Sequence, residues 1–581
     1  MRPASMVWMA LAALLSLGAM TPPATPWWRR AVIYEIYPRS FQDTDGDGIG
    51  DLNGITRRLP YLQRLGVDAI WIAPIYPSPQ VDFGYDITNY RIVDRQFGTL
   101  GDLDRLIAAA RTRRIHVVLD LVLNHTSDQH GWFRESASSR TNPKADWYVW
   151  NDGVPADAPG IGAVQRRSVH DGRAPPNNWT SGFGGSAWTW APARRQFYYH
   201  RFYRQQPDLN WRNPAVERAM LDTMRFWLDR GVAGFRLDAV TALFEDEQNR
   251  DEPEVGGVDA FGSPRLRHVH TDDLPQEHDV IRRMRTLVDG YAGDRVLIGE
   301  TWVADAAAMR RWYGTPALDE LQLPMDMFLG FGGPRYSPAW FRPRLVATQS
   351  DFGGGRPLFV FDNHDSVRSI DKFADGVHDL AIAKGIAAIL YLSRATALTY
   401  YGAEIGMRTR PPARREDVRD PVGLAGWPQD KGRDGERTPM QWSAGPQAGF
   451  STAARPWLPL NPDVARVNAE SEWRDPGSLL NWTARLIALR RSEPALRDGA
   501  MTLLERTPPD VLAWLRASPG GGAVLVALNM SARPQVLTVS GGELAEPLAA
   551  SDPADTRAAA GQIVLPPFAT WVGRVGTAAH R

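Results

Sequence analysis

The segment 231–240, GVAGFRLDAV, is a short apolar run that presents two charged side chains near its end. If this run forms a strand, Arg236 and Asp238 lie two residues apart and point to the same side. Burying them is costly unless they pair with each other or face a group that needs charge. The two explanations to separate are therefore an ion pair in a core and a functional site.

Polar residues end other apolar runs in the same way: Asn124 and His125, then Glu300, then His364 and Asp365. A structural ion pair would have to be repeated at four separate strand ends to explain this recurrence. Polar side chains on the loops that follow the strands are typical of enzymes built on a parallel barrel. The pattern therefore favours chemistry over core packing.

Eight apolar runs have the length and composition of buried strands: 31–41, 66–76, 116–125, 231–240, 295–302, 318–327, 356–365 and 395–406. Helical patterns lie between several of them, at 102–114, 214–231, 278–291 and 379–394. Strands that alternate with helices predict right-handed βα units, and eight of them predict an α/β protein with a (β/α)8 TIM barrel.

Two further regions interrupt or follow this pattern. Residues 126–205 are rich in Trp, Gly, Asn and Pro and are too long for a plain loop, which predicts a subdomain inserted after the third strand. A second, charged excursion covers 241–277. Beyond residue 500 the chain shows short alternating strands, which predict an antiparallel β-sandwich. We therefore expect a catalytic barrel at 27–125 and 206–500, an inserted domain at 126–205 and a β domain at 501–581.

The composition and the N-terminal segment indicate which binding partners and which cellular compartment to expect. The chain has 66 basic and 66 acidic residues, so its charge gives no support to nucleic acid as a partner. It has 0 Cys, which excludes disulfides and a cysteine nucleophile. Residues 1–20 have an early arginine and then an apolar run too short to favour a membrane anchor, as in a signal peptide. We expect a periplasmic or secreted protein that is free of the membrane after cleavage and is a monomer or dimer.

The segment DTDGDGIGD, residues 43–51, places oxygen ligands at alternating positions, a pattern that suggests Ca²⁺ with Mg²⁺ as the alternative. The expected ligands are Asp43, Asp45, Asp47, the carbonyl of Ile49 and Asp51. Gly54 stands where an EF-hand would have its last glutamate, so the loop is not an EF-hand. A solvated acidic turn is the competing interpretation.

Four segments, in order and at the expected strands, resemble glycoside hydrolase family 13, the α-amylase family: DLVLNH (120–125), GFRLDAV (234–240), GETW (299–302) and FDNHD (361–365). QPDLN (206–210), FGYDI (83–87) and RTPMQW (437–442) resemble its α-glucosidase and oligo-1,6-glucosidase branch. NNWTSGFGGSAWTW (177–190) is most similar to the maltase-like members. The resemblance covers residues 27–580 and implies the barrel fold and action on oligosaccharides.

The resemblance implies a catalytic role for three carboxyl groups. Asp238 matches the nucleophile, Glu300 the general acid/base and Asp365 a third carboxylate that steadies the transition state. Retaining glycosidases need two carboxyl groups only about 5–5.5 Å apart. Neighbouring strand ends can supply that spacing, and Arg236 is expected to keep the nucleophile ionised.

The resemblance also implies which side chains hold the terminal glucose unit: Asp82, Tyr85, His125, Phe183, Arg236, His364 and Arg437. Ala239 directly follows the nucleophile, as it does in maltose-cleaving members. The function implied is a retaining, exo-acting α-glucosidase, chiefly on α-1,4 bonds. A transglucosidase or trehalose synthase on the same scaffold is the alternative. An inactive relative that serves as a transporter subunit or binding module is disfavoured, because such relatives lose the three carboxylates.

Overall fold

The computed structural model describes residues 25–576 except 334, 351, 519–521, 540–543 and 560. The expected signal peptide, 1–20, lies outside the described residues. Among the described residues, no helix combines the length and apolar character that crossing a bilayer requires.

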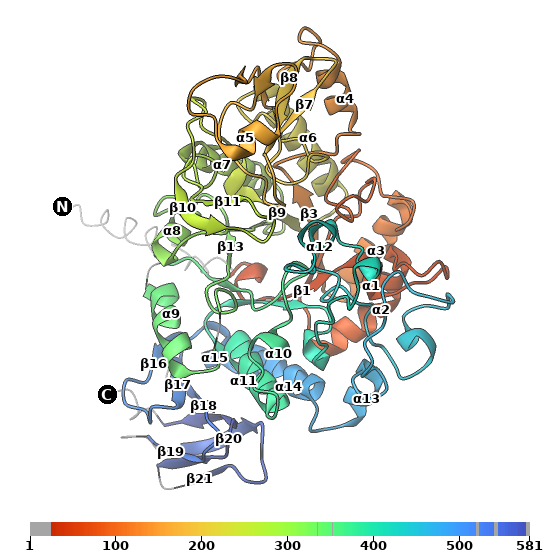
Figure 1. The fold of residues 1–581 in the computed structure, drawn as a ribbon. Helices are drawn as coiled ribbons and strands as arrows, with labels where there is room; N and C mark the ends of the chain where they lie inside the picture. Colours follow the sequence, from red (N-terminus) through yellow and green to blue (C-terminus); the bar gives the residue numbers. More distant parts are fainter. Residues whose placement is uncertain are drawn as a thin grey trace, which may run out of the picture.

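Eight parallel strands form a closed barrel in the middle of the molecule (Figure 1). Their order around the barrel is β1-β15-β14-β13-β12-β9-β3-β2. Their bounds are β1 (Val32–Ile36), β2 (Ala69–Ile72), β3 (His116–Val122), β9 (Gly234–Asp238), β12 (Val296–Gly299), β13 (Leu323–Asp326), β14 (Leu358–Phe359) and β15 (Thr396–Tyr400). Each strand lies inside one of the eight predicted runs, so the predicted TIM barrel is confirmed.

Helices surround the barrel and cover the outward side chains of its strands. The longer ones are α2 (Leu52–Leu65), α3 (Leu100–Thr112), α6 (Pro214–Asp229), α7 (Pro275–Asp289), α9 (Pro338–Ser350), α11 (Asp379–Leu392) and α14 (Leu479–Ser492). Local sequence sets where they begin: Thr99 and Asp102 form a capping box at α3, and Asn213 caps α6 ahead of Pro214.

Strand alternation divides the core into two parts. Ile33, Trp71, Val118, Ile298 and Leu398 belong to the cluster that fills the barrel interior. Their neighbours along the strands belong to the larger cluster packed beneath the helices. Because the inside is filled by side chains, the barrel is a solid support rather than a channel.

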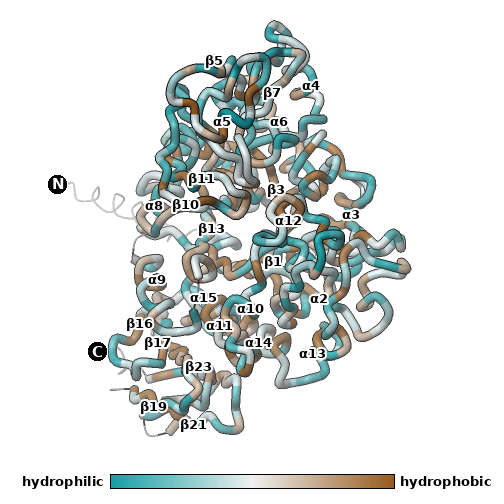
Figure 2. The backbone as a smooth tube through the Cα atoms, in the orientation of Figure 1, coloured by the Kyte–Doolittle hydropathy of each residue, from teal (hydrophilic) through white to brown (hydrophobic). Residues whose placement is uncertain are grey.

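The segment between β3 and α6 carries its own small elements: α4 (Gly131–Ser138), α5 (Ala163–Arg167), and a sheet of β4 (Trp150–Asn151), β8 (Gln196–Tyr199) and β7 (Trp188–Ala191). The segment after β9 contains a hairpin of β10 (Glu254–Val258) and β11 (Pro264–Leu266). Hydrophilic stretches line the outer loops near β5 (Val154–Pro155) and α4 (Figure 2). Both segments lie over the carboxyl ends of the strands.

The C-terminal region contains two antiparallel sheets. One has the order β16-β17-β18-β23-β20 and the other β19-β22-β21. Their bounds are β16 (Ala500–Leu503), β17 (Val511–Ala517), β18 (Ala523–Asn529), β19 (Gln535–Thr538), β20 (Leu544–Ala550), β21 (Arg557–Ala559), β22 (Gln562–Leu565) and β23 (Thr570–Val575). Val511, Leu525 and Trp571 of the first sheet share a core with Leu537 and Ile563 of the second. The predicted antiparallel sheets are thus present.

Candidate active site

One arginine and three carboxylates form the centre of the barrel's carboxyl end. Arg236 is fully buried, and its Nη1 lies 2.5 Å from Asp238 and 3.1 Å from Asp120. Its Nη2 lies 2.8 Å from Glu300 Oε2. The two terminal nitrogens of a single guanidinium therefore hold Asp238 and Glu300 beside each other.

Strand pairing produces this arrangement. β9 lies between β3 and β12, and Arg236 is the register partner of Asp120 on one side and Ile298 on the other. Glu300 directly follows β12, and its backbone N–H donates to the Leu237 carbonyl at 3.0 Å. The strand ladder thus brings the three carboxylates to one level.

Burial and mutual repulsion make the three carboxylates reluctant to ionise together. Burial raises the pKa of Asp238, opposed by Arg236 and reinforced by Glu300 and Asp120. Burial likewise raises the pKa of Asp120 to about 6, although Arg236 opposes it. With three acids around one base, the cluster favours keeping a proton, as a general acid must.

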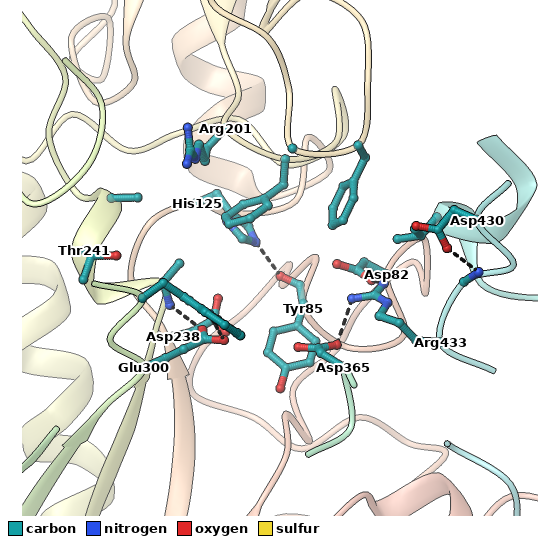
Figure 3. Close-up of a pocket in the computed structure, with 18 of the residues that line it drawn as sticks. Asp82, Tyr85, His125, Arg201, Asp238, Thr241, Glu300, Asp365, Asp430 and Arg433 are labelled. Carbon is teal, nitrogen blue, oxygen red and sulfur yellow. Dashed lines mark hydrogen bonds and ion pairs between the residues drawn. The ribbon is translucent and has the colours of Figure 1, made fainter. Parts of the chain in front are cut away.

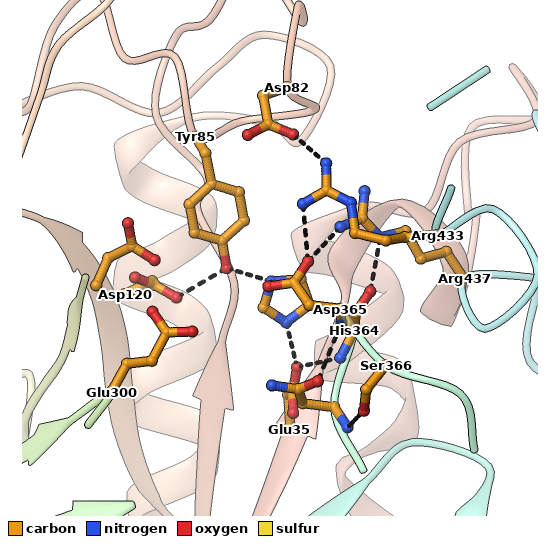
Figure 4. A network of polar contacts seen from close by, with 12 residues as sticks. Glu35, Asp82, Tyr85, Asp120, Glu300, His364, Asp365, Ser366, Arg433 and Arg437 are labelled. Atoms are coloured by element: carbon orange, nitrogen blue, oxygen red, sulfur yellow. Dashed lines mark hydrogen bonds and ion pairs between the residues drawn. The ribbon is translucent and has the colours of Figure 1, made fainter. Parts of the chain in front are cut away.

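A second ion-pair network surrounds Asp365 (Figure 4). Arg437 Nη2 donates to Asp365 at 2.6 Å, and Arg433 Nη1 donates to the same oxygen at 2.9 Å. Arg433 also contacts Asp82 at 2.6 Å and Asp420 at 2.9 Å. Burial opposes ionisation of Asp365, but the guanidinium groups of Arg433 and Arg437 hold its pKa well below its usual range. Asp365 is therefore a permanent negative charge.

His364 connects this network to the strands. Its Nδ1 lies 2.6 Å from Glu35 of β1, and its Nε2 lies 2.7 Å from the Tyr85 hydroxyl. The Tyr85 and His364 rings stack with centroids 5.3 Å apart. Burial lowers the pKa of His364 to about 3, so the ring is neutral near pH 7. It therefore orients Tyr85 without adding charge.

His125 contacts the backbone of Tyr85, whereas His364 contacts its hydroxyl group. The Nε2 of His125 is 3.1 Å from the Tyr85 carbonyl and 3.1 Å from Gln206 Nε2. Gln206 donates in turn to Asp82 at 3.1 Å. Burial lowers the pKa of His125 to about 3, so this ring is also neutral near pH 7. These contacts fix the wall of a pocket whose donors and acceptors suit sugar hydroxyls.

A cavity of about 560 Å³ opens between the two networks (Figure 3). Seven of the predicted site residues line it: Asp82, Tyr85, His125, Phe183, Asp238, Glu300 and Asp365. The other three are fully buried directly behind its wall: Arg236, His364 and Arg437. Phe183 comes from the segment inserted after β3 and stacks on Tyr203, with centroids 4.2 Å apart. The structure thus brings all ten predicted residues together.

Several site residues were not predicted from the sequence: Glu35, Asp120, Gln206, Trp302 and Arg433. Asp120, Gln206 and Trp302 lie inside motifs that were recognised, and an acid within a buried strand was an available signal for Asp120 and Glu35. Trp302 is 50% exposed, lines the cavity, and donates its indole N–H to Glu300 Oε1 at 3.2 Å. Arg433 had no signal beyond its place four residues before Arg437.

The acidic loop lies beside α2, away from the cavity. Asp43, Asp45 and Asp51 offer carboxylate oxygens that all lie within 4.8 Å of one another. The other two predicted ligands, Asp47 and the carbonyl of Ile49, follow in the same loop. Asp43 and Asp51 are buried, and no acid of the loop forms an ion pair with an arginine or lysine anywhere in the described chain. This chemistry fits a hard divalent cation.

Comparison with known proteins agrees with this geometry. Residues 35–331 and 341–499 match the model of the α-amylase catalytic domain. The chain is 43% identical to a probable α-glucosidase of Rhizobium meliloti (strain 1021), over 88% of this chain and 91% of that protein. It is 36% identical to an oligo-1,6-glucosidase of Parageobacillus thermoglucosidasius, over 88% and 91%.

A solved structure of an α-glucosyl transfer enzyme, XgtA, superposes with a TM-score of 0.84 at 39% identity, covering 95% of this chain and 100% of that one. The family match covers well over half of the chain, and the relatives align along most of their length. This chain therefore belongs to glycoside hydrolase family 13, the α-amylase family, in its branch of α-glucosidases and oligo-1,6-glucosidases.

Proposed function

We propose that the protein is a retaining, exo-acting α-glucosidase that releases glucose from the nonreducing end of short α-glucosides. The observation that carries this proposal is the pair Asp238 and Glu300, held by one guanidinium on the cavity wall. Two neighbouring carboxyl groups are the arrangement that direct displacement at an anomeric carbon requires.

In the proposed reaction, Asp238 attacks the anomeric carbon while Glu300 gives its proton to the leaving glycosidic oxygen. Water then enters, Glu300 removes a proton from it, and the glucosyl–Asp238 bond breaks. Asp365 stays ionised beside the sugar, where its charge favours the oxocarbenium-like transition state.

The exo mode is supported by ion pairs along one side of the cavity. Arg433 bridges Asp82, Asp365 and Asp420, and Gln206 ties Asp82 to His125. These contacts link side chains across the Asp82 side of the cavity, an arrangement that favours a chain end over the middle of a polymer. Phe183 supplies an apolar wall from the inserted segment, and Arg433 stacks over its ring at 5.5 Å.

Transfer of the glucosyl unit to another sugar is the second candidate function. Trp302 supports it, because half of its surface is exposed in the cavity beside the proposed acid/base. An exposed indole is a good stacking platform for an acceptor sugar. The structural likeness to an α-glucosyl transfer enzyme points the same way.

Product analysis tests these proposals. We expect maltose and short maltooligosaccharides to be consumed faster than isomaltose, sucrose, trehalose or starch. Proton NMR of the earliest product should show α-glucose, since two displacements retain configuration. Early release of β-glucose would contradict the retaining mechanism, and new oligosaccharides at high maltose concentration would support transfer.

We further propose that Asp43, Asp45 and Asp51 hold a structural Ca²⁺, with Mg²⁺ as the alternative. Three neighbouring carboxylates, two of them buried, repel one another, and a divalent cation relieves that repulsion. Such an ion would brace the loop after β1 and the start of α2, where Asp51 is the N-cap.

We also propose that the protein is exported and that residues 1–20 are removed. The support is the sequence pattern of that segment. Mass spectrometry of protein from its native host should find an N-terminus between residues 18 and 26. An intact Met1 in the soluble cytosol would contradict export.

A further inference from the structure

A second cavity lies at the opposite end of the barrel, where the strands begin. It has a volume of about 220 Å³ and lies among the amino ends of β1, β2 and β3, α14, and α15 (Pro494–Asp498). Its lining residues are Trp27, Arg30, Asp68, Arg114, His116, Arg490, Arg491 and Arg497. Five of these eight residues are arginines, which is unusual for a cavity that only fills space.

Acidic partners neutralise only part of this charge. Arg491 pairs with Asp68, while Arg30 and Arg497 share Asp498 at 2.6 and 2.8 Å. Five guanidinium groups against these two carboxylates leave three positive charges. The excess positive charge lies on Arg114, on Arg490, and on Arg30 and Arg497, which share the single carboxylate of Asp498.

Arg114 has no hydrogen bond or ion pair from its side chain within the described chain, and it is exposed at the cavity. Its φ is +59°, just past the end of α3, where glycine is the preferred residue. The α3 C-terminus already receives Arg113, whose Nη1 donates to the Ala109 carbonyl at 3.0 Å. The backbone conformation of Arg114 therefore belongs to the cap of α3, in which the Ile115 N–H donates to the Ala110 carbonyl at 3.0 Å, and its unpaired side chain is what remains to be explained.

Arg490 forms the fixed back of the cavity. It is 4% exposed, and its guanidinium donates to the carbonyls of Arg30, Tyr391, Ser393 and Ala395. These partners carry no net charge, and Arg490 shares the nearby Asp68 carboxylate with Arg491. On another side Trp27 stacks on His116, with centroids 4.0 Å apart. The cavity thus has rigid walls and a surplus of cationic donors.

We propose that this cavity is an oxyanion-binding site that takes phosphate, either as the free ion or as the phosphoryl group of a small phosphomonoester. Guanidinium groups present planar pairs of donors that match the oxygens of a tetrahedral dianion. The volume exceeds the roughly 30 Å³ of one water molecule several-fold, so a phosphate enters with room to spare. Bound there, it joins α14 and α15 to the amino ends of the first three strands.

Isothermal titration of the whole protein with inorganic phosphate tests the site. Chloride holds the ionic strength constant, and saturating glucose blocks the catalytic cavity. We expect saturable binding of one phosphate. Arg114→Gln should weaken it about tenfold, the scale of one charge-assisted hydrogen bond. Arg166→Gln, which removes an exposed arginine of α5, should leave it unchanged.

A second titration, with glucose 6-phosphate, separates the two possible sources of the phosphate group. Glucose 6-phosphate binding more tightly than inorganic phosphate would identify a phosphorylated sugar as the ligand, and the reverse would identify the free ion. The absence of saturable phosphate binding to the wild type would overturn the proposal. So would wild-type phosphate affinity in both Arg114→Gln and the double variant Arg114→Gln/Arg497→Gln. Turnover of maltose provides an independent check that the variants are folded.

Discussion

The two ends of the barrel carry opposite charge on the same strands. At the carboxyl ends, Asp120, Asp238 and Glu300 outnumber the single Arg236 they surround. At the amino ends, arginines outnumber acids in a half-open cavity. At the first end acidity is concentrated and desolvated, which suits a proton donor and a nucleophile. At the second end positive charge stays near solvent, which suits reversible capture of an anion.

The largest expected effect is on the acidic end. Glu300→Gln removes the proposed proton donor and keeps its shape, so kcat/KM on maltose should fall by about 10²–10⁴-fold. An aryl glucoside with a good leaving group needs less protonation and should lose less. Asp222→Asn, an exposed helix position on α6, is the matched control and should keep wild-type activity. Equal losses on both substrates would contradict the acid role.

Arg433→Met sharpens the comparison by removing positive charge from the acidic end. Three carboxylates lose a partner, and we expect kcat/KM to fall about 10–100-fold. The pKa of Asp365 should rise, because Arg433 helps to hold it down. A carboxyl group with a depressed pKa loses its ionised form as pH falls through that pKa, so Asp365 should stay ionised down to a lower pH in the wild type than in the variant. Arg433→Lys should restore part of the lost activity, and a wild-type kcat/KM in Arg433→Met would contradict this account.

A smaller effect concerns linkage. Ala239 lines the cavity beside Asp238, at a φ of +44°. Ala239→Val should shift the ratio of kcat/KM for isomaltose over maltose upward by about tenfold, since one or two carbons in a pocket wall are worth roughly 1–3 kcal/mol. A branched side chain is strained in this left-handed conformation, so Tm should also fall. The ratio, measured on one preparation, is independent of the fraction folded. Ala239→Ser is the unbranched control, and a flat ratio would refute the idea.

The smallest effect should come from metal removal, since the residues of the acidic loop do not line the catalytic cavity. Chelation should lower Tm by a few degrees and leave kcat nearly unchanged at assay temperature. Asp45→Asn should abolish the response to the chelator. A Tm that does not respond to chelation, with no Ca²⁺ or Mg²⁺ by elemental analysis, would exclude the site.

The fold was predictable because each barrel strand is mainly apolar and nearly all of its residues are buried. The predicted site residues were found through short motifs at strand ends. The contacts around these residues were harder to foresee. Arg433 contacts Asp82 although 351 positions separate the two in the sequence, and no local pattern predicts that contact. The arginine cavity was missed for the same reason. Its walls come from the amino ends of the first three strands and from α14 and α15, and each arginine alone resembles an ordinary surface residue.

Barrel closure itself has a consequence for how the protein is made. Residues 32–35 of β1 pair with residues 397–400 of β15, and Ser40 bonds to the carbonyl of Arg437. A ribosome therefore releases the first strand long before its second neighbour exists, and the entropy of closing so long a loop must be met late. Until then the edge of β1 is open and the cavity lacks Arg433 and Arg437. The nascent chain is thus inactive toward sugars and dependent on protection from aggregation until about three-quarters of it has been translated.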